Sequence, residues 1–178
     1  KDFDKKVQKK NQILTKGIEV GHIFYFGDKY SKSLNCFVDT QDGKKSAIKM
    51  GSYGIGVSRL VGAIIEAKYN DGVMKWPKSV SPYEVVIIPN INKNNNQSLE
   101  KAMKIYEDLK RSDIDVLIDD VNENMSSKFK KHDLIGIPFQ IIIGSKSLND
   151  KFEFKEVGLE PVLLNLKEIK NKLKNKIV

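Results

Sequence analysis

The residues with the clearest chemical potential lie in one stretch, residues 51–60, which reads GSYGIGVSRL. Three glycines in its first six positions let the backbone turn tightly and let a ligand approach the main chain. Apolar residues then recur at the spacing of one buried helical stripe, so we expect a helix to begin after Gly56. Its unpaired N–H groups would attract an anion. The stretch therefore predicts a strand, a tight turn and a helix around an anion site. The stripe consists of Val57, Leu60, Val61, Ile64 and Ile65.

Arg59 is the strong cation of this stretch. A guanidinium fixed on a helix suits a phosphate oxygen, and such a charge-assisted bond contributes about 1.5–3 kcal/mol. The glycine spacing is G-x-x-G-x-G, which differs from the dinucleotide fingerprint, and no Gly-Lys-Ser/Thr follows as a P-loop requires. On these residues alone, a packed strand–helix turn with a surface arginine stays open as the alternative.

Composition allows two modules of moderate size within 178 residues. The formal charge of +8 comes from the lysine-rich ends, residues 1–16 and 165–178, and the chain between them is neutral. The lysines at the two ends could either contact RNA or form a solvated surface. The sequence contains no apolar run long enough to predict a membrane-spanning segment. The single Cys36 fits a reducing cytoplasm, and two separated histidines with one cysteine argue against a structural zinc site.

The elements that must position Arg59 are predicted to be antiparallel strands. Residues 18–39 are rich in β-branched and aromatic side chains, and Asp42-Gly43 predicts a hairpin turn between residues 34–39 and 45–50. The helix after Gly56 is expected to return across this sheet. Residues 3–14 could form an amphipathic helix.

Breaks at Asn70-Asp71-Gly72, Trp76-Pro77 and Ser81-Pro82 predict a domain boundary, giving domains 1–80 and 81–178. The second domain alternates strands and helices, which implies parallel pairing. Phe152 and Phe154 predict a half-exposed edge strand, and Asn165 with Glu168 a capping box for a last helix. We expect a mixed sheet of about five strands with three helices. The remaining expected strands are 83–88, 114–118, 139–143 and 162–164, and the remaining expected helices are one whose apolar face runs from Leu99 to Leu109 and one at 126–135.

Four runs, in their order and spacing, closely resemble the C-terminal part of bacterial-type prolyl-tRNA synthetases, which are class II aminoacyl-tRNA synthetases. The resemblance extends from roughly residue 17 to residue 165. It implies an α+β / α/β fold, in which the end of an antiparallel-sheet catalytic domain precedes a mixed five-stranded anticodon-binding domain. The runs are GIEVGHIF (17–24), GDKYS (27–31), MGSYGIGVSR (50–59) and DLIGIP (133–138).

The resemblance implies ATP-dependent activation of proline and its transfer to tRNA-Pro. Arg59 matches the motif-three arginine that holds the ATP γ-phosphate, and Gly54 and Gly56 match the turn beneath the adenylate. ATP would come with Mg²⁺ as a substrate, without a protein metal ligand in this chain. The amino-acid pocket would include Glu19, His22, Gly51 and Ser52.

In the second domain, Glu123 and Lys128 match anticodon-contact positions, and Lys146 is a further candidate. Two arginines and a Pro-Gly that are usual in the family before Lys128 are absent here, and Asp28 replaces a usual threonine. Class II motifs one and two are also absent, so we expect a fragment that is inactive alone and comes from a cytoplasmic, homodimeric enzyme. The alternatives are a non-catalytic RNA-binding relative and an α/β module that binds another nucleotide.

Overall fold

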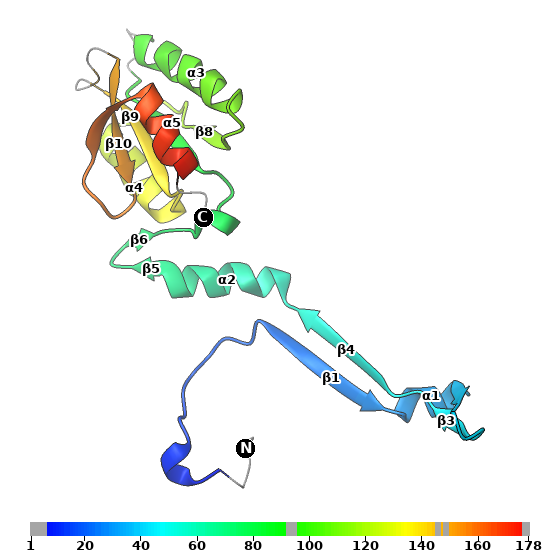
Figure 1. Cartoon of the computed structure of the whole chain (residues 1–178). Helices are drawn as coiled ribbons and strands as arrows, with labels where there is room; N and C mark the ends of the chain where they lie inside the picture. The colour runs from blue at the N-terminus through cyan, green and yellow to red at the C-terminus, as the bar shows by residue number, and fades with distance from the viewer. Residues whose placement is uncertain (1–6, 92–95, 145–146, 148–149, 176–178) are drawn as a thin grey trace. The chain divides into compact units, whose positions relative to one another are not determined.

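Two apolar runs form the centre of the larger sheet in the computed structural model, which describes residues 7–91, 96–144, 147 and 150–175 (Figure 1). Strands β7 (Val85–Pro89) and β9 (Phe139–Ile143) are buried along their whole length. Continuous burial on both faces is typical of parallel strands covered by helices. By Cα proximity the chain separates into two units, residues 1–63 and 64–178. The predicted domain limits, 1–80 and 81–178, stay a prediction.

The second unit has the predicted mixed five-stranded sheet, in the order β11-β10-β9-β7-β8. Strand β7 is parallel to both β8 and β9, whereas β10 is antiparallel to β9 and β11. The predicted architecture is confirmed for this unit. Its other elements are β5 (Tyr69–Asn70), β6 (Val73–Met74), η2 (Lys78–Val80), α3 (Gln97–Lys110), β8 (Val116–Ile118), α4 (Met125–Ile135), β10 (Lys151–Glu156), β11 (Val162–Asn165) and α5 (Leu166–Asn175).

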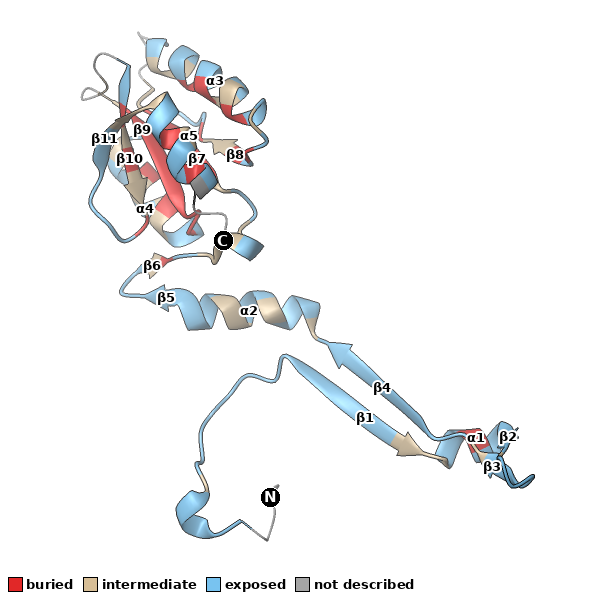
Figure 2. Ribbon diagram, in the orientation of Figure 1, coloured by how far each residue is buried: buried red, intermediate tan, exposed pale blue. Residues whose placement is uncertain are grey.

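Helices cover both faces of this sheet, and Figure 2 shows the buried residues concentrated between them. Val85 and Ile87 of β7 pack with α3 and α5, while Val86 and Ile88 pack with α4. This alternation follows from the period of two in a strand. Burial of each such side chain contributes about 1.5–3 kcal/mol, so this sheet supplies most of the apolar stabilisation.

Strand β10 corrects one prediction. Phe152 and Phe154 are buried, and β10 lies inside the sheet because β11 pairs with it and forms the edge. The Phe154 ring stacks on Phe139 of β9 with centroids 5.4 Å apart. The buried face of α3 also differs slightly from the predicted apolar face, since Ile105 is buried and Met103 is exposed.

The helix ends follow local signals. The predicted capping box is confirmed: the backbone N–H of Asn165 donates to Glu168 Oε2 at 2.8 Å, and that of Glu168 donates to Asn165 Oδ1 at 2.9 Å. Asn124 caps α4 by accepting from the Ser127 N–H at 2.8 Å. Helix α4 ends at Gly136, whose φ of 79° is the left-handed conformation that glycine favours. A Cβ there would lie 2.7 Å from the Met74 carbonyl oxygen, so only glycine fits.

The first unit is built on a long two-stranded antiparallel ladder, β1 with β4. The predicted hairpin around Asp42-Gly43 is confirmed in shorter form, with β2 paired to β3. Helix α2 begins in this unit and ends in the second. The elements are η1 (Lys9–Asn11), β1 (Gly21–Gly27), α1 (Lys29–Ser33), β2 (Phe37–Asp39), β3 (Lys45–Ala47), β4 (Met50–Ile55) and α2 (Val57–Lys68).

Three predictions for this unit are wrong. Residues 51–55 are strand and not turn, because they pair with β1 as far as Ile55, which leaves Gly56 between strand and helix. No residue of α2 is buried, so its apolar stripe covers no sheet in this structure. Of the helix predicted for residues 3–14, residues 3–6 lie outside the described part, and residues 7–14 contain only the 3₁₀ turn η1. No helix in the described ranges is long and apolar enough to span a bilayer.

Candidate functional site

Arg59 and Glu19, which are 40 positions apart in the sequence, meet in the first unit. The guanidinium Nη1 of Arg59 donates to the Glu19 carbonyl oxygen at 2.9 Å and lies 3.4 Å from Glu19 Oε1. Both side chains stay largely exposed, at 57% and 63%, so the ion pair itself adds little stability. The contact holds the arginine near the start of α2 and leaves part of its guanidinium accessible to a ligand.

The β1–β4 register gathers three other predicted residues on one face. His22 lies opposite Gly54, and Phe24 lies opposite Ser52, so these four positions share a face of the ladder. The His22 and Phe24 rings lie 4.4 Å apart, which confirms their common side. Gly51 lies opposite Tyr25 and belongs to the other face.

Gly51 and Gly56 allow neighbouring atoms to approach the backbone closely, and none of the three motif glycines forms a turn with a positive φ. None of Gly51, Gly54 and Gly56 has a positive φ. A Cβ at Gly51 would lie 3.0 Å from the Phe24 carbonyl oxygen, and one at Gly56 would lie 3.2 Å from Arg59 Cβ. Gly54 has open space around its Cβ position, which leaves its backbone accessible beside His22. This arrangement offers one cation, one imidazole and bare main chain to an anionic ligand. The described residues contain no group of three metal-ligating side chains.

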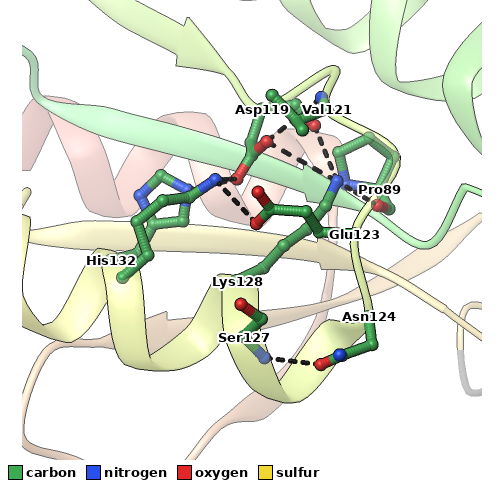
Figure 3. A network of polar contacts seen from close by, with 9 residues as sticks. Pro89, Asp119, Val121, Glu123, Asn124, Ser127, Lys128 and His132 are labelled. Carbon is green, nitrogen blue, oxygen red and sulfur yellow. Dashed lines mark hydrogen bonds and ion pairs between the residues drawn. The ribbon is translucent and has the colours of Figure 1, made fainter.

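A second polar cluster lies in the second unit, where α4 meets the loop after β8 (Figure 3). Lys128 is fully buried, and its Nζ donates to the carbonyl oxygens of Pro89 at 3.1 Å and Asp119 at 2.9 Å. The buried Asp119 carboxylate accepts from Lys131 at 2.9 Å and bonds His132 Nε2 at 2.7 Å. The cluster ties the ends of β7 and β8 to one face of α4.

Glu123 is the exposed end of this cluster. Its Oε2 lies 3.3 Å from Lys131 Nζ, so Lys131 bridges the buried Asp119 and the exposed Glu123. The backbone N–H of Val121 also donates to Asp119 Oδ1 at 3.2 Å, which fixes the intervening loop. Glu123 is therefore a carboxylate whose position depends on the ion pair between the partly exposed Lys131 and the buried Asp119.

Protonation states follow from burial and pairing. Burial opposes ionisation of Asp119, but the hydrogen bonds of Lys131 and His132 outweigh it and lower the pKa of this carboxyl. Burial lowers the pKa of His132 and of Lys128, and Asp119 only partly offsets this in each case. The hydrogen bond to Asp119 raises the pKa of Lys131. A neutral His132 donates to the carboxylate from Nε2, and its Nδ1 is buried without a partner.

The second cluster changes the predicted set of RNA-contact residues. Lys128 cannot touch RNA directly, because its ammonium is enclosed and bonded to protein carbonyls. Glu123 is exposed and stays a prediction, and Lys146 lies outside the described residues. Sequence reasoning missed Asp119, Lys131 and His132. The available signal was an aspartate directly after a strand, followed by cationic side chains at helical spacing.

The mixed five-stranded sheet with helices on both faces defines an α/β domain. Residues 84–176 match the family model described as anticodon binding domain, and the chain belongs to this family. The predicted kinship with prolyl-tRNA synthetases is confirmed by relatives that cover nearly the whole chain. A proline–tRNA ligase of Pelagibacter ubique (strain HTCC1062) is 58% identical over 98% of the chain, and one of Wolbachia sp. subsp. Brugia malayi (strain TRS) is 48% identical over 92%.

A third relative, the proline–tRNA ligase of Parvibaculum lavamentivorans (strain DS-1 / DSM 13023 / NCIMB 13966), is 49% identical over 82% of the chain. The chain spans only 41%, 35% and 33% of the lengths of these three proteins, in the order given. The similarity therefore concerns a part of each ligase that includes both units described here.

Proposed function

We propose that this chain is part of a proline–tRNA ligase, which activates proline with ATP and transfers it to tRNA-Pro. The supporting observation is that similarity to proteins named proline–tRNA ligase continues through the first unit, beyond the residues that match the anticodon-binding family. An RNA-binding relative without catalysis has no physical need for the first-unit residues. In this proposal the first unit belongs to a class II catalytic domain, and the enzyme is a cytoplasmic homodimer.

In the first unit, Arg59 neutralises the γ-phosphate of ATP. Its partly exposed guanidinium and its tether to Glu19 suit this task, because a cation that is already positioned loses little freedom when the ligand binds. Gly54 and Gly56 offer main chain to the adenylate. The amino-acid pocket includes Glu19, His22, Gly51 and Ser52, of which Gly51 contributes its backbone. Mg²⁺ enters with ATP and shields the phosphates.

In the second unit, Glu123 accepts hydrogen bonds from anticodon base amino groups, and Lys131 positions its carboxylate. The buried Lys128–Asp119–His132 group acts only through this positioning. The family assignment supports tRNA as the partner of this unit.

The test is pyrophosphate exchange into ATP, measured on the full-length protein with single amino acids. We expect exchange with proline, and a loss of at least 100-fold in Arg59→Ala, because a fixed charge on the transferring group is removed. Arg111→Ala is the matched control, since Arg111 follows α3 in the second unit, and we expect less than a twofold effect.

Binding of tRNA-Pro to the Arg59→Ala protein is measured in parallel and is expected to persist. Exchange that depends on threonine or histidine would contradict the assignment. Binding of tRNA without any amino-acid-dependent exchange would favour the non-catalytic relative.

A further inference from the structure

A hollow of about 480 Å³ lies between α3, the start of β10 and the start of α5. Its apolar lining comes from Ile105, Phe152 and Leu166. Helices α3 and α5 pack on the sheet face that α4 does not cover, so the hollow is distinct from the Asp119–Glu123 cluster (Figures 1 and 2). A volume of this size accommodates one small ligand.

The hollow is positively charged. Lys101, Lys104 and Lys167 line it, and none of them pairs with a carboxylate in the described part of the chain. Asp108 is neutralised by Lys170 of α5. Among the described residues, three unpaired ammonium groups and one unpaired carboxylate, that of Asp150, therefore line the hollow. This balance favours an anion.

Directional polar groups accompany the charge. Asn165 lines the hollow, and its Oδ1 is already used in the capping box. Its amide donors find no partner among the described residues, while Asp150 offers an exposed acceptor. A ligand with an apolar plane, edge hydrogen-bonding groups and a phosphate satisfies all three features. An acidic peptide would use the lysines but leave the apolar lining unfilled.

A second hollow of similar volume provides the contrast. It is lined by Tyr69, Trp76 and Phe139 and also carries lysines. Two of these lysines are already bound: Lys75 pairs with Glu156 at 2.8 Å, and Lys78 with Glu84 at 3.4 Å. Among the described residues, this leaves one lysine without an ion pair, Lys68, beside the second hollow and three beside the α3–α5 hollow. The number of unpaired cations beside the apolar lining thus distinguishes the α3–α5 hollow.

We propose that the α3–α5 hollow binds a nucleotide, with its base against Ile105, Phe152 and Leu166 and its phosphate on Lys101, Lys104 and Lys167. The nucleotide is either free or one unit of an RNA strand. This site goes beyond the proposed ligase activity and does not depend on it.

The probes are AMP and a fluorescent 12-residue oligouridylate, titrated onto the 178-residue chain at several salt concentrations. The variant is Lys101→Ala/Lys104→Ala/Lys167→Ala. We expect it to bind oligouridylate at least tenfold more weakly, with a salt slope smaller by about 2, because each phosphate contact on a single strand contributes about 0.7 to that slope. The matched control, Lys110→Ala/Lys151→Ala/Lys174→Ala, removes the same charge outside the hollow, and we expect less than a twofold change.

Circular dichroism verifies that both variants fold. Oligouridylate that binds much more tightly than AMP indicates an RNA strand, and equal binding indicates a free nucleotide; both support the site. Equal binding by an abasic oligomer of the same length, or equal competition by a 12-residue polyglutamate, would overturn it. Equal losses in the two triple variants would also overturn it. Because the probe carries no anticodon and no amino acid is present, failure here leaves the pyrophosphate-exchange test unaffected.

Discussion

Lys128 has an environment that matters for stability, because its side chain is fully buried and its ammonium has no access to water. In Lys128→Met, the carbonyls of Pro89 and Asp119 lose their donor and the Asp119 carboxylate loses a buried neighbour. We expect the free energy of unfolding to fall by about 3 kcal/mol, the usual cost of breaking a buried charge pair. Urea unfolding measures this. Lys130→Met, on the exposed side of α4, is the control and should change stability by less than about 0.5 kcal/mol.

His132 predicts a pH dependence of stability. Burial keeps its pKa below the ordinary 6.5, with Asp119, Lys128 and Lys131 as its charged neighbours. The unfolded chain therefore binds more protons just below pH 6.5, so this contribution is complete above that pH and is lost as the pH falls. We expect unfolding free energies to fall between pH 7 and pH 5, and His132→Gln to flatten that fall. His22→Gln, at an exposed position, is the control, and an unchanged slope in His132→Gln would refute the assignment.

For single residues, the sequence predicts which side chains belong to a site better than it predicts whether each one is buried or exposed. Arg59 and Glu19 could be assigned to one site from motif order, and the structure brings them together. Lys128 was predicted to contact RNA because it matches an anticodon-contact position of the family and because a lysine can bind phosphate. Its burial depends on the carbonyl of Pro89, which is 39 residues away and belongs to a strand that only the folded sheet places there.

Gly136 makes the end of α4 sensitive to substitution. Gly136→Ala must adopt a positive φ and also bring its Cβ to 2.7 Å from Met74. Gly158 provides a matched control, because its φ is also positive, at +84°, but nothing lies within 4 Å of its Cβ position. We expect Gly158→Ala to cost about 1 kcal/mol from backbone strain alone. Gly136→Ala should cost at least about 2 kcal/mol more, because backbone atoms must move. Thermal unfolding of both variants checks this, and equal losses would contradict it.

Elements with strong local signals were predictable. The capping box at Asn165 and Glu168 needs only neighbouring residues, and the run 139–143 is apolar enough to specify a buried strand. Residues 51–55 were not predictable, since glycine spacing looks the same whether the chain turns or pairs closely with another strand. Pairing with β1 makes these residues a strand. Likewise, Phe152 and Phe154 alternate with charged residues as in an edge strand, but β11 takes the edge position and the two rings pack into the core beside α3 and α5.

The two units differ sharply in burial. Among residues 7–63, all of them described, only Ser31 is buried, whereas the second unit contains a continuous apolar core. A two-stranded ladder has marginal stability in water without further packing. We therefore expect amide hydrogen exchange in β1 and β4 of the 178-residue chain to be at least about 1,000-fold faster than in β7 and β9, following local opening energies. Mass spectrometry of exchanged peptides measures this, and comparable protection would show that the first unit is stable in isolation.

The enclosed Lys128 side chain also gives the protein a built-in chemical reporter. Reagents that acetylate amines modify exposed lysines within minutes, whereas the nitrogen of Lys128 becomes reactive only when α4 separates from β7 and β8. The time course of its modification, normalised to the exposed Lys130, would report the opening rate of the second unit. No dye, tag or engineered cysteine would be needed.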